Sequence, residues 1–161
     1  MNLKKIAQNS LENTIAGLFI LFVIITFAQV VARYVFNDPF TWSEELARYL
    51  FVWTVMLAGG LGIQRGAHIG VDALIEKLPR RFQPVIEVIN HLLVIVFLLF
   101  LTIKGFSMAM INISTPSPAM QVSLGWAYLA IPIGAFVMLI FSMEKIYEIF
   151  IRRNSKVGGE K

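Results

Sequence analysis

The sequence predicts an all-α integral membrane protein with four transmembrane helices and both termini in the cytoplasm. Hydrophobic residues make up 57% of the 161 residues and charged residues only 15%. A soluble domain of this size would need more polar side chains to cover its surface. The apolar residues also come in long blocks, and the basic residues flank those blocks. This pattern is typical of a single membrane domain, here spanning 1–161, and argues against a nucleic-acid-binding surface.

The first predicted span covers about 13–35. Twenty uncharged residues lie between Glu12 and Arg33, and at about 1.5 Å per residue they cross the roughly 30 Å hydrocarbon core. A cleaved signal peptide is the alternative, because Lys4 and Lys5 precede the apolar run. The run exceeds the roughly 7–15 apolar residues usual in a signal peptide, which favours a retained helix.

The second predicted span covers about 42–64 and must include charged residues. Only sixteen residues separate Arg48 from Arg65, about 24 Å of helix, which is too short to cross the membrane. The helix therefore begins near Trp42 and draws Arg48 into its first turns. Thr41 and Glu44 match the T-x-x-E capping box, which predicts that the Thr41 hydroxyl caps this helix.

The third and fourth predicted spans cover about 83–110 and 126–149. Pro132 lies inside the fourth span and predicts a kink there, because proline removes one helical hydrogen bond. A polar tail is expected at 152–161.

Two connections carry their own signals. Between spans two and three, apolar residues recur at i, i+3, i+4 and i+7, which predicts a short amphipathic helix at about 70–78 lying in the membrane interface. A structured soluble loop is the alternative. The uncharged segment 112–125 contains two prolines and is either a loop or a short re-entrant segment.

The distribution of basic residues predicts the orientation. Eleven of the fourteen Lys and Arg residues fall on the side of the termini and of the connection between spans two and three. Arg33, Arg48 and Lys104 fall on the opposite side. The positive-inside rule therefore assigns both termini and the connection between spans two and three to the cytoplasm.

The charges at the start of the second span form the main candidate site. Glu44 and Glu45 fall in the first turn, where the helix dipole favours carboxylates, and Arg48 can pair with either. Unpaired at the bilayer centre, each charge would cost roughly 2.5–3.5 kcal/mol. Three interpretations remain open: a capped helix end, a polar contact with a partner helix or lipid headgroup, or substrate or ion binding. The candidate interface residues here are Arg33, Trp42, Glu44, Glu45, Arg48 and Tyr49.

Small residues recur every four positions along the second span, at Thr54, Ala58, Gly62 and Gly66. Such spacing lets helix backbones approach closely. The seam joins two helices of this chain or, as the alternative, two subunits. Ala58, Gly62 and Gly66 are therefore also candidate interface residues.

The residues of the chain argue against an enzyme and against a bound cofactor. The chain has no Cys and two His, and no phosphate loop or Ser/His/Asp set is present. A haem between two histidines needs them at matching depth, whereas His68 lies in a loop and His91 inside a span. His68 and Asp72 are better interpreted as a loop-ordering pair. Glu12 resembles the membrane carboxylate of small multidrug exporters, which is a further alternative.

Three segments together resemble the small membrane subunit of tripartite ATP-independent periplasmic (TRAP) transporters. They are RYVFNDPFTWSEELARYLFVW, GIQRGAHIGVDALIEKLP and GWAYLAIPIG. Their order along four spans extends the resemblance over nearly the whole chain.

The resemblance implies a non-catalytic subunit of a sodium-coupled transporter for an organic acid, such as sialic acid or a C4-dicarboxylate. It implies that a large multi-span subunit carries the substrate and sodium sites, so that no cofactor is expected on this chain. The small subunit braces the large one among membrane lipids and helps dock a periplasmic substrate-binding protein. It also implies that Trp42, Glu45, Arg48, His68 and Asp72 are structural or interface positions. The alternatives are a haem- or quinone-binding anchor of a respiratory enzyme and a stand-alone small exporter.

Overall fold

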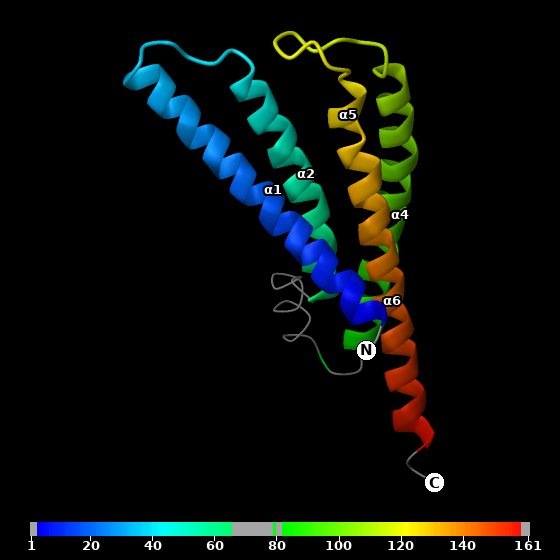
Figure 1. Ribbon diagram of the computed structural model, residues 1–161. Helices are drawn as coiled ribbons and strands as arrows, with labels where there is room; N and C mark the ends of the chain where they lie inside the picture. Colours follow the sequence, from blue (N-terminus) through cyan, green and yellow to red (C-terminus); the bar gives the residue numbers. More distant parts are fainter. Residues whose placement is uncertain (1–2, 66–78, 80–81, 159–161) are drawn as a thin grey trace.

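The computed structural model describes residues 3–65, 79 and 82–158, which form helices joined by loops (Figure 1). The helices are α1 (Leu3–Tyr34), α2 (Ser43–Gln64), α4 (Gln83–Ile111), α5 (Gly125–Tyr128) and α6 (Ala130–Gly158). Over the described ranges, four helical segments are long and apolar enough to cross a membrane. The predicted all-α fold with four spans is confirmed.

The four spans pack as a row in the order α1, α2, α6, α4. Figure 1 shows α1 and α2 diverging from α4, α5 and α6 toward the end that carries the 35–42 and 112–124 connections. Both termini lie at the other end. The predicted interfacial helix at 70–78, together with Gly66, His68 and Asp72, lies outside the described residues.

Glycines allow the close contact between α2 and α6 at the centre of the row. A Cβ atom added at Gly60 would lie 2.8 Å from the Val137 side chain, and one at Gly134 would lie 2.5 Å from the Cβ of Met56. These glycines lie beside the predicted small-residue stripe. Of that stripe, Thr54 is buried and its hydroxyl donates to its own helix at Leu50, while Ala58 and Gly62 are half-buried.

The fourth span is interrupted, as Pro132 predicted. Leu129 separates α5 from α6, three residues before the proline. Pro132 has no N–H to donate to the carbonyl four residues earlier. Gly105 of α4 lies against this break, because a Cβ there would be 3.0 Å from Ile131 and 3.1 Å from Pro132. Beyond the break, α6 continues to Gly158, so the first part of the expected polar tail is helical.

An ion pair joins α1 to α2 near the end that carries the termini. The Arg65 guanidinium lies 2.7 Å from the Glu12 carboxylate, with both side chains substantially exposed. α1 begins ten residues before the predicted span, which places Glu12 within the helix. The Glu12 carboxylate is therefore paired, unlike the free membrane carboxylate that an exporter would need.

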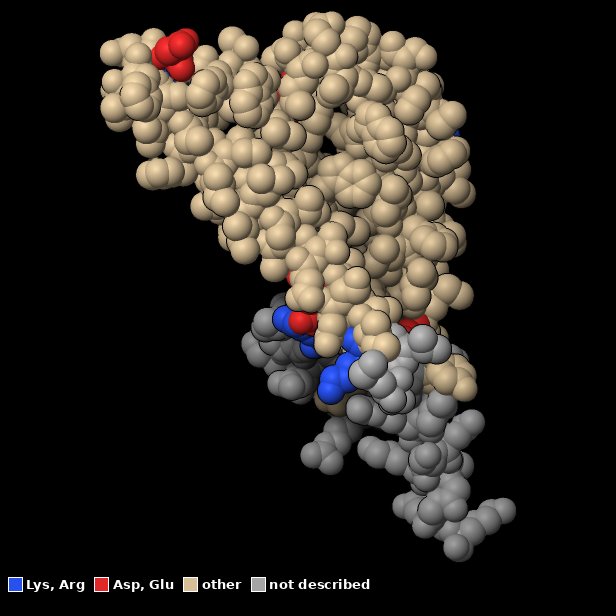
Figure 2. All heavy atoms as spheres, viewed as in Figure 1, with Lys and Arg blue, Asp and Glu red and all other residues tan. Residues whose placement is uncertain are grey.

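The outer helices expose long apolar faces. In the most apolar windows of α1 and α4, 6% and 17% of residues are buried, compared with 39% in α2. Figure 2 shows a broad surface without charged side chains between the two ends of the molecule, with basic side chains gathered at the end of the termini. Such a surface suits contact with lipid or with a partner protein.

Candidate functional site

The predicted capping box at the start of α2 is wrong. α2 begins at Ser43, and its N-cap residue Trp42 has helical backbone angles and no side-chain cap. The chain already turns before the helix, because the Ser43 N–H and hydroxyl both donate to the Phe40 carbonyl. The Thr41 side chain instead lines a cavity beside the helix.

The charges on α2 divide between two faces of the helix. The Arg48 guanidinium lies 3.6 Å from the Glu44 carboxylate, and both side chains are about two-thirds exposed. The predicted alternative pairing of Arg48 with Glu45 is not found among the described ion pairs. Glu45 instead faces another part of the chain.

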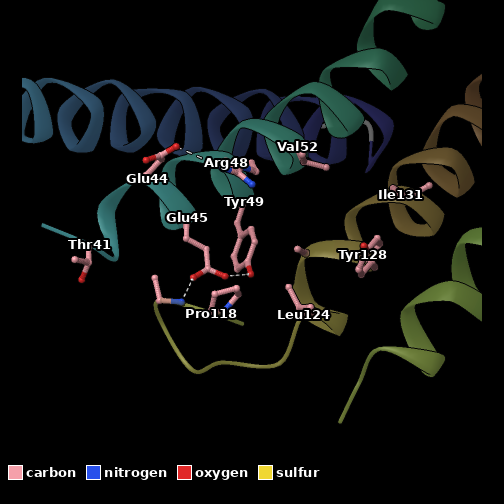
Figure 3. Close-up of a pocket in the computed structure, with 12 residues that line it drawn as sticks. Thr41, Glu44, Glu45, Arg48, Tyr49, Val52, Pro118, Leu124, Tyr128 and Ile131 are labelled. Carbon is pink, nitrogen blue, oxygen red and sulfur yellow. Dashed lines mark hydrogen bonds and ion pairs between the residues drawn. The ribbon is translucent and has the colours of Figure 1, made fainter. Parts of the chain in front are cut away.

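Glu45 holds the 112–124 connection onto α2. One carboxylate oxygen accepts the backbone N–H groups of Ala119 and Met120, each at 2.9 Å. The other accepts the Tyr49 hydroxyl at 2.5 Å (Figure 3). Three donors from two segments therefore converge on a single carboxylate, and hydrogen bonds to a charged acceptor are the stronger kind.

The 112–124 connection is an ordered hairpin-like loop held by its own backbone hydrogen bonds. The Ser117 N–H donates to the Val122 carbonyl at 2.7 Å, and the Leu124 N–H donates to Thr115 at 2.9 Å. Gln121 has a φ of 56° and closes the tip. This tip turns consecutive N–H groups toward one point, an arrangement that suits an anion such as the Glu45 carboxylate.

A second contact ties the same regions together. The Trp53 indole N–H donates to the Trp126 carbonyl at 3.1 Å and so joins α2 to α5. Ser117 is fully buried, and its side chain lies beside Glu45 and Tyr49. The loop, α5 and the first turns of α2 thus form one connected unit, which we call the α2 platform (Glu45, Tyr49, Trp53 and 117–126).

A cavity of about 590 Å³ opens between α2 and this loop (Figure 3). Its polar rim includes Glu44, Arg48 and Tyr49, and its apolar wall includes Val52 and Ile131. A cation and an apolar wall suit a partner side chain or a lipid. Across the part of the chain that the structure describes, no group of three or more His, Asp or Glu residues could hold a metal ion.

The remaining predicted site residues lie apart from the α2 platform. Arg33 is exposed in the last turn of α1, where a cation matches the helix dipole. Trp42 is exposed and stacks on Phe40 with ring centroids 5.8 Å apart. His91 is buried in α4. The sequence interpretation missed Ala119, Met120, Trp53 and Trp126, and the uncharged, proline-containing loop was the available signal for an ordered contact.

Comparison with known families identifies one match over most of the chain. Residues 22–152 match the family described as "Tripartite ATP-independent periplasmic transporters, DctQ component". The matched region contains α2, the 112–124 loop and the break before α6.

Curated relatives agree with this match. The chain is 26% identical to the sialic acid TRAP transporter small permease protein SiaQ of Vibrio cholerae, over 91% of this chain and 85% of that protein. It is 34% identical to the sialic acid TRAP transporter permease protein SiaT of Haemophilus influenzae, over 81% of this chain but only 21% of that protein. It is 32% identical to the C4-dicarboxylate small permease protein DctQ of V. cholerae, over 62% of this chain and 43% of that protein.

Proposed function

The chain belongs to the DctQ family of TRAP transporter small permease subunits, and we propose that it braces the large transport subunit of a sodium-coupled organic-acid transporter. The match over residues 22–152 carries this proposal. The matching proteins are transporter permeases and not enzymes, which favours this function over a respiratory anchor. The chain is a multi-pass protein of the inner membrane.

We propose that both termini face the cytoplasm. The basic side chains visible in Figure 2 gather at the end of the termini, as the positive-inside rule requires. In this orientation the α2 platform lies at the periplasmic surface. The site residues at the start of α2 then lie where a periplasmic protein and the outer leaflet can reach them.

The contacts at the start of α2 support a bracing role. Glu45 is engaged by the loop and Tyr49, and Glu44 is paired with Arg48. Both carboxylates are therefore occupied by contacts within this chain. A transport site instead needs polar groups that bind and release a solute. We place the sodium and solute sites on the large subunit.

The longer relatives suggest the partner. SiaT of H. influenzae and the isethionate permease protein DctMQ of Oleidesulfovibrio alaskensis each contain a region similar to this chain within about a fifth of their length, 21% and 22%. We infer that the rest of those proteins corresponds to a large subunit. The solute is proposed only as a class: organic acids that include sialic acid, C4-dicarboxylates and sulfonates.

The platform also offers a surface for docking a periplasmic binding protein. Its loop is anchored by Glu45 and by the Trp53–Trp126 hydrogen bond. A pre-ordered surface loses little conformational entropy on binding. Arg48 and Trp126 are exposed beside this loop and provide a charge and an aromatic side chain for the contact.

Co-purification tests the bracing role. We expect the tagged chain, expressed with its neighbouring genes and extracted in mild detergent, to recover a large multi-span protein. Arg48→Ala should lower that recovery without changing which solute is carried, because Arg48 is exposed and lines the open cavity. Gly17→Ala is the matched control, since a Cβ at Gly17 would meet nothing within 4 Å.

Two results would contradict the proposal. Purification of the wild-type chain without any large membrane partner would contradict the bracing role. A changed solute profile in Arg48→Ala would show that this residue takes part in solute recognition.

A further inference from the structure

Lys104 is an exposed basic residue well inside α4. It lies seven residues before the end of α4 at Ile111, which is roughly 10 Å along the helix axis. Its neighbour Gly105 packs against Ile131 and Pro132, beyond the first turns of the fourth span. Ile131 in turn lines the cavity together with Val52, nine residues after the start of α2. Lys104 therefore lies about two helical turns inside the apolar span Val88–Ile111 rather than at its end.

No carboxylate pairs with Lys104 among the described residues, where Glu44 pairs with Arg48 and Glu12 pairs with Arg65. An unpaired lysine at membrane depth is costly, and lysines usually avoid this cost by extending the ammonium group to the nearer surface. Arg48 can do so, because helical side chains lean toward the helix N-terminus and α2 begins at the nearby surface. The Lys104 side chain leans toward the N-terminus of α4. It therefore leans away from the nearer membrane surface, which lies at the C-terminal end of α4.

The residues around Lys104 form a continuous exposed strip. Leu93, Phe97, Phe100, Lys104 and Ile111 follow the spacing of a helix-packing seam, in steps of four, three, four and seven. The apolar members are 59–71% exposed. The chain's own core lies on the other side of α4, where Leu98 and Ala109 are buried. A seam with one cation at its centre favours a helix that supplies an anion.

We propose that this strip packs against a membrane helix of the large transport subunit, and that this helix presents a carboxylate to Lys104. The inference rests on the proposed function, because it assigns a face on α4, in addition to the start of α2, by which this chain binds that subunit. Charge complementarity favours a protein helix over lipid as the partner of this strip. Lipid tails supply no anion at this depth, and the headgroup phosphates of the nearer surface lie on the side opposite to that toward which the Lys104 side chain leans.

Cross-linking from single cysteines tests the assignment of the face. The natural chain has no Cys, so each introduced cysteine can carry one maleimide photo-cross-linker. In the co-expressed complex, we expect Phe97→Cys and Phe100→Cys to cross-link to the large subunit. Leu92→Cys and Leu99→Cys are matched controls, because both residues are exposed on the other flank of α4 and should give no protein adduct.

Substitution of the charge tests the pairing itself. Lys104→Met should lower recovery of the large subunit about three- to tenfold, the range expected for one polar contact between membrane helices, while Lys104→Arg should retain it. Unchanged recovery in Lys104→Met would overturn the pairing. Lipid adducts alone at Phe97 and Phe100, in preparations that still contain the large subunit, would overturn the face but leave the proposed function standing. Absence of the large subunit from the wild-type preparation would instead overturn the proposed function, and the inference with it.

Discussion

Gly134→Ala should lower the stability of the purified chain more than Gly60→Ala or Gly105→Ala would. The added Cβ would lie 2.5 Å from the Met56 Cβ, 2.8 Å from the Met56 carbonyl oxygen and 2.9 Å from its carbon. The backbone atoms cannot rotate away as a flexible side chain would, so α2 and α6 must separate. Overpacking of this kind costs about 1–3 kcal/mol, which corresponds to a fall in Tm of roughly 3–10 °C.

Thermal unfolding followed by circular dichroism in detergent measures this effect. Gly17→Ala is the control, because it adds the same methyl group to a helix where nothing lies within 4 Å. Alanine has the higher helix propensity, so the control should leave Tm unchanged or raise it. Equal Tm values for the two variants would mean that α2 and α6 do not pack as described.

Glu45→Ala should release the 112–124 loop from α2. It removes the acceptor of the Ala119 and Met120 N–H groups and of the Tyr49 hydroxyl. Hydrogen bonds to a charged group contribute about 1.5–3 kcal/mol each when buried, and this site is partly exposed. We expect the two amides to exchange hydrogen roughly 10- to 100-fold faster in the variant, because the loop opens locally.

Hydrogen exchange with mass spectrometry on a peptide covering 112–124 provides the readout. Glu44→Ala is the matched control one residue away, because Glu44 contacts Arg48 in an exposed pair and such pairs contribute little. Glu45→Gln should fall between the two, since its amide keeps one acceptor oxygen. Identical exchange in Glu45→Ala and the wild-type chain would show that Glu45 does not hold the loop.

The sequence was sufficient for the features that depend on local composition. Long apolar blocks predicted the four spans, and Pro132 predicted the break that the structure shows at Leu129. The close spacing of Arg48 and Arg65 predicted that α2 must begin near Trp42, which is the N-cap residue. Each of these conclusions follows from helix length or from one missing hydrogen bond, so no knowledge of distant contacts was needed.

The structural features that could not be predicted from the sequence depend on backbone atoms far away along the chain. Two of the three donors to Glu45 are N–H groups 74 and 75 residues away, and backbone donors leave no mark in side-chain patterns. The T-x-x-E match failed because the chain turns at Thr41 and Trp42 before α2 begins. The predicted stripe (Thr54, Ala58, Gly62 and Gly66) likewise ran beside Gly60 and did not include Gly134. Which face of α2 meets α6 is decided by packing of the whole row.

Reconstituted uptake tests most directly the claim that this chain supports transport without carrying the solute. Proteoliposomes would hold the large subunit and the binding protein with or without this chain, and a third set would hold this chain alone. Labelled sialic acid, C4-dicarboxylates and isethionate would be offered under a sodium gradient. We predict uptake of one organic-acid class only when all three proteins are present. Uptake by this chain alone, or full uptake without it, would contradict the account.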